Sequence, residues 1–134
     1  MKKPLKSFLR VIIILISVFL VLGVGFMLFA SYNYRALEAE VIEDADLVTI
    51  ADGTYRGNYR VFPVEAIVDV VIKNHKIEEI QLVKHVNGMG QAAEALPSQV
   101  VEAQTLQVDL VSGASFSSKV ILLAIEDALT HAAD

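Results

Sequence analysis

The stretch Asp109-Leu-Val-Ser-Gly-Ala-Ser-Phe-Ser-Ser118 decides the fold, because it joins a strand-like approach to the last long helix. Before it, Leu106 and Val108 alternate with polar residues, as in a half-buried strand that returns to the sheet. After it, residues 116–130 have helical spacing, so a helix is expected to begin near Ser115. A helix N-terminus presents unpaired N–H groups and a positive dipole end. A serine there can cap the helix or hold a phosphate group, and spacing alone leaves both open.

Three segments upstream have the alternation of β-strands, namely residues 54–61, 64–73 and 76–83. Asn74 and His75 form a two-residue connection between the second and third, and asparagine tolerates the positive φ of a tight hairpin. Gly57 interrupts the first strand, where a bulge or a close backbone approach is expected. The three strands should form an antiparallel sheet.

The stretch between the sheet and the last helix contains a loop and two short helical pieces. Residues 87–90 read Asn-Gly-Met-Gly and predict a flexible loop. A helical piece follows over 91–96 and should end at Pro97, after which Ser98 can cap a second short turn. The last helix has a broad apolar face that must pack on the sheet. The predicted class is α+β, with a small antiparallel sheet covered by helices.

An uncharged apolar run of 20 residues occupies positions 11–30. As a helix it would span roughly 30 Å, the thickness of the hydrocarbon core of a bilayer. It is longer than the apolar part of a cleaved signal peptide, and a buried core helix would not need its basic leading flank. We expect a retained transmembrane anchor.

The charges on either side of this run predict its orientation. Four basic residues precede it and only Arg35 follows closely, so the N-terminus should be cytoplasmic and the rest extracytoplasmic. From Ala36 onward, 6 Lys+Arg face 16 Asp+Glu, a balance of −10 that argues against binding nucleic acid. The expected organisation is a basic segment and anchor over 1–30, a juxtamembrane spacer over 31–46 and a domain over 47–134.

Cysteine is absent, which excludes disulfides, thiolate metal sites and cysteine nucleophiles. The three histidines are too scattered to predict a metal site. His85, at the end of a strand, is expected to be a surface or loop residue more than a ligand contact.

Several motifs follow one another in a characteristic order: Asp52-Gly-Thr-Tyr-x-Gly57, a hairpin, a Gly-x-Gly loop, then Asp109-x-x-Ser-Gly-Ala-Ser115-x-Ser-Ser118 and an alanine-rich helix. Over residues 47–129 this pattern resembles the FMN-binding domain, the flavin-carrying domain of subunits in the Rnf complex and the sodium-pumping NADH:quinone reductase. The resemblance implies that a flavin transferase, using FAD and magnesium, attaches FMN to Ser115 through a phosphoester. The family usually has threonine there. Asp109, Ser112, Gly113 and Ala114 match the recognised motif.

Other residues would complete the flavin site. Ser117 and Ser118 could donate hydrogen bonds to the phosphate, and Gly113 would allow close approach. The isoalloxazine ring needs an apolar slot with few polar groups. Candidates for that slot are Tyr55, Tyr59, Met89 and Phe116, with Gly90 in the adjoining loop.

The predicted function is electron transfer by a membrane-anchored, extracytoplasmic flavoprotein, a carrier or redox subunit more than a stand-alone enzyme. Its expected partners are the membrane, the flavin transferase, and a redox protein or quinone-linked membrane complex. Two alternatives stay open. One is a non-redox assembly module that keeps the fold, and the other is an oxidoreductase with non-covalent FMN.

Overall fold

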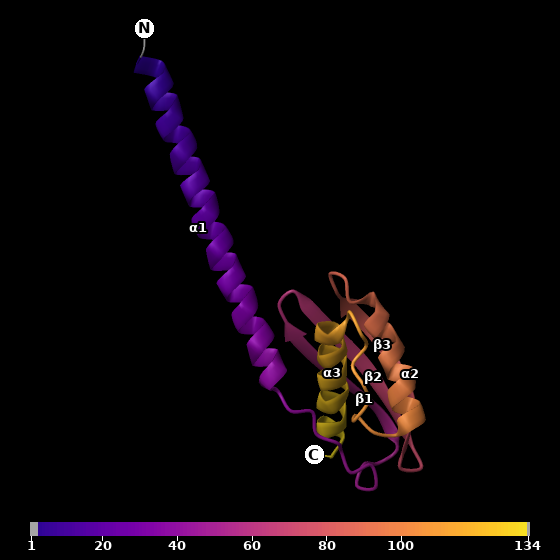
Figure 1. Ribbon diagram of the computed structural model, residues 1–134. Coiled ribbons are helices and arrows are strands. Elements are labelled where there is room, and N and C mark those ends of the chain that lie inside the picture. The colour runs from indigo at the N-terminus through magenta and orange to yellow at the C-terminus, as the bar shows by residue number, and fades with distance from the viewer. Residues whose placement is uncertain (1–2, 134) are drawn as a thin grey trace. The chain divides into compact units, whose positions relative to one another are not determined.

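The computed structural model describes residues 3–133, with side chains described from Lys6 to Ala133. The chain divides into two compact units, Met1–Ala36 and Leu37–Asp134 (Figure 1). The elements in chain order are helix α1 (Lys3–Ala39), strands β1 (Gly53–Val61), β2 (Val64–Lys73) and β3 (Lys76–Val86), the 3₁₀-helix η1 (Gln91–Ala95), and helices α2 (Leu96–Ala103) and α3 (Ser115–Ala133). The predicted α+β class is confirmed.

Helix α1 contains the uncharged run and is long and apolar enough to cross a membrane, with a mean hydropathy of 3.1 over an 18-residue stretch. Large apolar side chains such as Phe19 and Met27 are exposed on it. The helix continues beyond the run to Ala39, and its last turn carries Leu37, which is buried in the core of the second unit.

The residues after α1 are tied to the rest of the second unit by hydrogen bonds. The Asp44 carboxylate accepts one from the Thr105 hydroxyl at 2.5 Å and one from the Leu106 N–H at 2.6 Å. The Gln107 side-chain amide donates to the Ile42 carbonyl at 2.9 Å. The compact unit therefore begins at Leu37, ahead of the expected boundary at 47.

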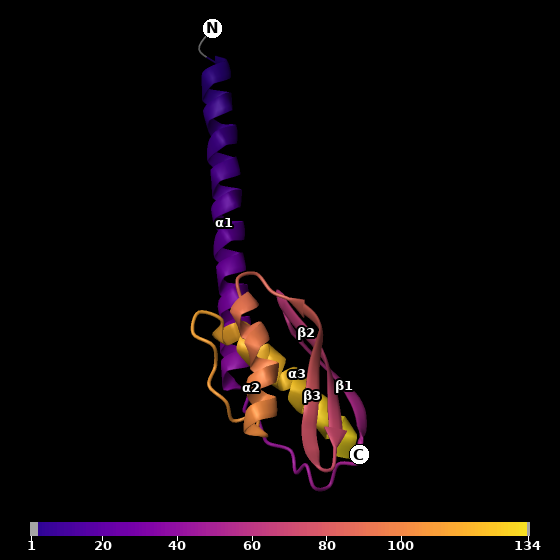
Figure 2. The same ribbon diagram turned by 90° about the vertical axis from the view of Figure 1, so that its right-hand side faces the viewer.

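The sheet has the order β1-β2-β3 with both pairs antiparallel (Figure 2). Asn74 and His75 have φ values of 51° and 59°, so the predicted tight hairpin is confirmed and both central residues have the positive φ of a type I′ turn. Strand β3 extends to Val86, beyond the expected end at 83. The ladder between β2 and β3 shifts register twice, at Ile67/Val68 and at Val71/Ile72.

Helices α2 and α3 cover one face of the sheet, with α3 over β1 and β2 and α2 over β3 (Figure 2). Alternate residues of β2 are buried against them: Val64, Ala66, Val68, Val70 and Ile72. At Gly57 the backbone of α3 lies directly on β1, because an added Cβ would be 2.0 Å from the Ala124 carbonyl oxygen. Pairing with β2 continues in register there, so this glycine serves close approach and not a bulge.

Two local predictions were wrong. Residues 106–108 do not join the sheet. They alternate because the segment runs beside α3 and buries Leu106 against the core. Pro97 does not end a helix but lies in the first turn of α2, where a missing N–H costs no helical bond. Ser98 accordingly caps nothing; its hydroxyl donates to the Ala95 carbonyl at 2.8 Å.

Candidate functional site

A tight turn over residues 111–114 delivers the chain to α3. The Ala114 N–H donates to the Val111 carbonyl at 3.0 Å, and Gly113 has φ of 78° at the third position of the turn. A positive φ at that position is the signature of a type II turn and favours glycine. Ser112 and Gly113 are exposed, and nothing lies within 4 Å of a Cβ built on Gly113.

Helix α3 begins at Ser115, as predicted. Its hydrogen-bond ladder starts where the Ser118 N–H donates to the Ala114 carbonyl at 2.8 Å, so the N–H groups of the first turn lie outside the ladder. The first turn contains no acidic residue, and the Ser115 side chain is exposed. The helix start thus combines a reachable hydroxyl with backbone donors and a favourable dipole for an anion.

The two serines that follow are buried, Ser117 at 2% and Ser118 at 0% exposure. The Ser118 hydroxyl oxygen accepts a hydrogen bond from the Val111 N–H at 3.1 Å. This bond holds the turn against the helix that it precedes. Ser117 lies against Gly90, where an added Cβ would be 1.9 Å from the Ser117 Oγ. The structure therefore places Gly90 against Ser117, and Ser118 against the turn at Val111, in the first turn of the helix that begins at Ser115.

His85 belongs to the same region, and the expectation of a surface histidine was wrong. Its side chain is 2% exposed, with Nδ1 at 3.1 Å from Glu94 Oε1 and 3.2 Å from Asn87 Nδ2. Within residues 6–133 its buried Nε2 has no hydrogen-bond partner. Because Lys84 pairs with Ile67 and Leu82 with Val68, Val83 is an extra residue in the ladder. That irregularity reverses the alternation and turns His85 toward the core, opposite Ala66.

The aromatic candidates on β1 lie elsewhere. The Tyr55 hydroxyl donates to the Ala51 carbonyl at 2.9 Å, and its ring covers Gly53. Gly57, two residues further along β1, faces Ala128, which is 13 residues (128 − 115) beyond the start of α3. At 1.5 Å per residue this is roughly 20 Å, so the fold does not bring Tyr55 to Ser115.

Tyr59 and Met89 occupy different environments. Tyr59 is half-buried, and burial, reinforced by the carboxylates of Glu40 and Glu126, raises the pKa of its hydroxyl. It is therefore a neutral packing residue at neutral pH. Met89 is 95% exposed in the loop that contains Gly90. Gly90, the next residue, lies against the first turn of α3, and the proposed ring contact Phe116 lies within that turn.

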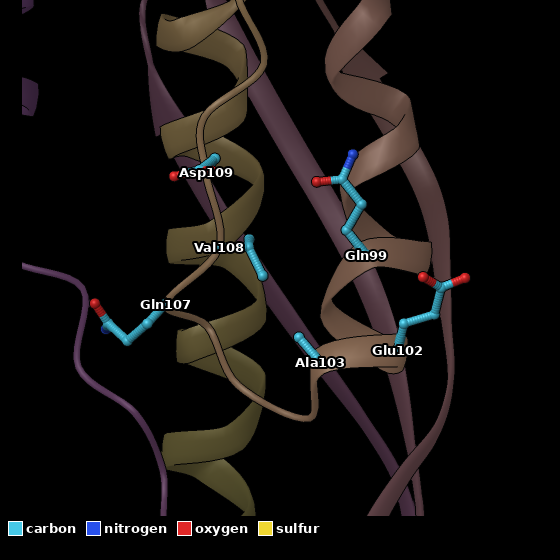
Figure 3. A pocket seen from close by; sticks show the side chains of 6 residues that line it. All are labelled: Gln99, Glu102, Ala103, Gln107, Val108 and Asp109. Atoms are coloured by element: carbon cyan, nitrogen blue, oxygen red, sulfur yellow. The ribbon is translucent and has the colours of Figure 1, made fainter.

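Asp109 is exposed on the segment that leads to the turn. With Gln107 and Val108 it lines one side of an open groove of about 490 Å³, and Gln99, Glu102 and Ala103 of α2 line the other (Figure 3). The segment thus presents the acidic residue of the motif beside α2.

The family model described as the FMN-binding domain matches residues 63–130, from the start of β2 to nearly the end of α3. The chain belongs to the FMN-binding domain family. No curated protein sequence matches it. Membership supports flavin binding with FMN as the cofactor, which agrees with the resemblance drawn from the motifs.

The residues at the start of α3 fit such a cofactor. FMN carries a phosphate, and the exposed Ser115 hydroxyl stands at a helix N-terminus with no acidic neighbour in the first turn. Gly113 leaves open space on the same turn, since nothing lies within 4 Å of its Cβ position. The Ser118 hydroxyl is fully buried and accepts the hydrogen bond from the Val111 N–H, so it supports the turn from within.

Proposed function

We propose that this member of the FMN-binding domain family is a membrane-anchored, extracytoplasmic flavoprotein for electron transfer, with FMN linked to Ser115 through a phosphoester. The observation that carries the proposal is the exposed Ser115 hydroxyl at the first position of α3, inside the segment matched by the family. When bound, FMN supplies the redox chemistry. The chain supplies the attachment point and its orientation.

The attachment step balances as a phosphoryl transfer from FAD. The Ser115 oxygen forms a bond to the phosphorus of the FMN half, the bond between the two phosphates of FAD breaks, AMP leaves, and the serine proton is released. A flavin transferase with magnesium would catalyse it, because within residues 6–133 no hydrogen bond links the Ser115 hydroxyl to a base that could take its proton. Serine provides the same oxygen nucleophile as threonine, without the methyl group that restricts χ1.

Once formed, the phosphodiester would be held by the first-turn N–H groups of α3 and the positive end of its dipole. The turn over 111–114, held by its hydrogen bonds, would orient the Ser115 hydroxyl to which the phosphate is attached. Met89 in the adjoining loop gives the ring an exposed apolar side chain to pack against.

The anchor is proposed from α1. The hydroxyls of Ser17 and Ser31 form hydrogen bonds inside the helix, since Ser17 donates to the Ile13 carbonyl and Ser31 to the Met27 carbonyl, both at 2.8 Å. Such internal bonds suit a lipid environment, where unpaired polar groups are costly. Basic residues before the run support a cytoplasmic N-terminus. A redox protein or a quinone-linked membrane complex would exchange electrons with the flavin.

Intact-mass analysis of the full chain co-expressed with a flavin transferase tests the attachment. Wild type should gain the mass of FMN less water, Ser115→Thr should do the same, and Ser115→Ala should gain nothing. An unshifted wild type, under conditions that load a threonine-bearing domain, would exclude the covalent link. Flavin released by acid precipitation would point to the non-covalent alternative, and colourless protein to the non-redox module.

A further inference from the structure

The segment 107–110 lies between α2 and α3 and belongs to neither. Its α2 side is the groove lined by Gln99, Glu102 and Ala103 (Figure 3). Its other side faces residues 40–42 together with Lys119 and Leu122 of α3. The chain here has the side-chain alternation of a strand but lies outside the three-stranded sheet.

The main chain of this segment has unused hydrogen-bonding groups. Its flanks are paired, since the Gln107 N–H donates to the Thr105 hydroxyl at 3.0 Å and the Val111 N–H to the Ser118 hydroxyl at 3.1 Å. Between them, no hydrogen bond within residues 3–133 involves the main chain of Val108, Asp109 or Leu110. Asp109 and Leu110 are exposed. An exposed row of open donors and acceptors is a template for a strand from another protein.

The charge around the groove indicates which kind of strand from a partner protein could bind there. From Gln91 to Ser118 the chain contains no lysine or arginine, whereas Glu102 and Asp109 both line the groove. Gln99 adds a neutral amide, whereas the amide of Gln107 is directed away from α2 and donates to the Ile42 carbonyl (Figure 3). An extended segment with a basic side chain would complement this surface, and an acidic one would be repelled.

The position of the segment, close to Ser115 in the chain, indicates which protein would bind it. Leu110 is followed directly by the 111–114 turn, which two hydrogen bonds hold against α3, and then by Ser115. A protein bound along 108–110 therefore has the Ser115 hydroxyl at a fixed place relative to its own active site. An enzyme that modifies Ser115 requires this arrangement, because it must bring the hydroxyl to its own bound FAD.

We propose that this groove is the docking site of the FAD-dependent flavin transferase, which adds an extended strand with a basic side chain to the main chain of 108–110, against α2. The inference rests on the proposed function and deepens it. It assigns Gln99, Glu102 and Ala103, which lie outside the sequence motif, to the transferase interface.

The test measures docking separately from attachment. Full-length Ser115→Ala in detergent micelles, which cannot be loaded, is titrated with purified transferase in the presence of FAD and magnesium. Adding Glu102→Lys to this Ser115→Ala parent should weaken transferase binding about tenfold. Binding of the transferase to the parent itself should weaken as the salt concentration rises. Adding Leu110→Pro, which removes an unbonded N–H, should weaken it similarly. Glu79→Lys, on an exposed residue of β3 outside the groove, is the charge-matched control and should bind like the parent.

In chains that keep Ser115, the groove variants should raise KM for loading with little change in kcat, because docking precedes the chemistry. Equal binding by the parent, Glu102→Lys and Leu110→Pro would overturn the docking site. So would an equal loss in Glu79→Lys. If transferase binding depends on the groove residues but wild type shows no mass shift, covalent attachment is rejected and the docking site stands.

Discussion

Gly90 lies against Ser117, so closely that a Cβ on the glycine would be 1.9 Å from the serine Oγ and 2.5 Å from its Cβ. The contact joins the loop after β3 to the first turn of α3. Asn87, in the same loop, also approaches the buried His85. The loop therefore contacts both the buried histidine and the first turn of the helix that begins at Ser115.

Gly90→Ala should destabilise the second unit by about 1–3 kcal/mol, because the methyl group has no space beside Ser117. At roughly 4–8 °C per kcal/mol, thermal unfolding followed by circular dichroism would detect this. Gly88→Ala is the control, since nothing lies within 4 Å of its Cβ position. Combining Gly90→Ala with Ser117→Gly should recover part of the loss. Equal melting of the two alanine variants would contradict the contact.

Ser118→Ala should also destabilise the unit, by about 1–3 kcal/mol, because it leaves the Val111 N–H without its acceptor. Hydrogen exchange should accelerate at Val111, and loading of Ser115 should slow as the turn loosens. Ser98→Ala removes an exposed hydroxyl that bonds to the nearby Ala95 carbonyl at the end of η1, so it should leave both readouts unchanged. Unaltered exchange at Val111 in Ser118→Ala would count against the role of this bond.

The sequence predicts the start of α3 and the hairpin because both depend on local chemistry. Asn74 and His75 tolerate positive φ, and the change from alternation to helical spacing at Ser115 is visible in the residues themselves. His85 could not be placed this way. An extra residue at Val83 reverses which side chains face the core, and register depends on pairing with β2, which no local pattern reveals.

The segment before α3 illustrates a second limit. Leu106 and Val108 alternate with polar residues as a strand would, yet the segment packs beside α3. Alternation reports that every second side chain is buried and does not say whether the backbone is paired. The hydrogen bonds between Asp44 and residues 105–106 could not be predicted from a local pattern either, because they require two segments about sixty residues apart to meet.

Asp44→Ala should destabilise the second unit by about 1.5–3 kcal/mol, since its carboxylate holds both the Thr105 hydroxyl and the Leu106 N–H. The neighbouring Glu43→Ala keeps the backbone N–H that donates to Glu126 and is the matched control, expected to change stability little. Hydrogen exchange at Leu106 should rise only in Asp44→Ala. The same rise in both variants would show that general loosening, and not this carboxylate, is responsible.

The outer face of the sheet provides a prediction on pH. Arg56 donates two hydrogen bonds of 2.7 Å to the Asp69 carboxylate, and these bonds hold the pKa of Asp69 below its ordinary value. A carboxylate whose pKa is lowered by folding adds stability above its unfolded pKa of about 3.9 and loses it as pH falls through the folded pKa. Arg56→Gln should therefore melt slightly below wild type at pH 6–7, and the gap should close in acid.

The size of this gap should be small, because the Arg56 side chain is 64% exposed and water screens the pair. Melting temperatures of both proteins between pH 7 and pH 2 measure it. The pKa of Glu65 is also lowered, first by its hydrogen bond from Lys84, but that pair is intact in both proteins and cancels in the difference. Lys76→Gln removes an exposed positive charge that forms no ion pair within residues 6–133, so it should show no acid-dependent gap. A gap for Arg56→Gln that persists below the folded pKa of Asp69 would assign the stability to packing of the arginine stem and not to the ion pair.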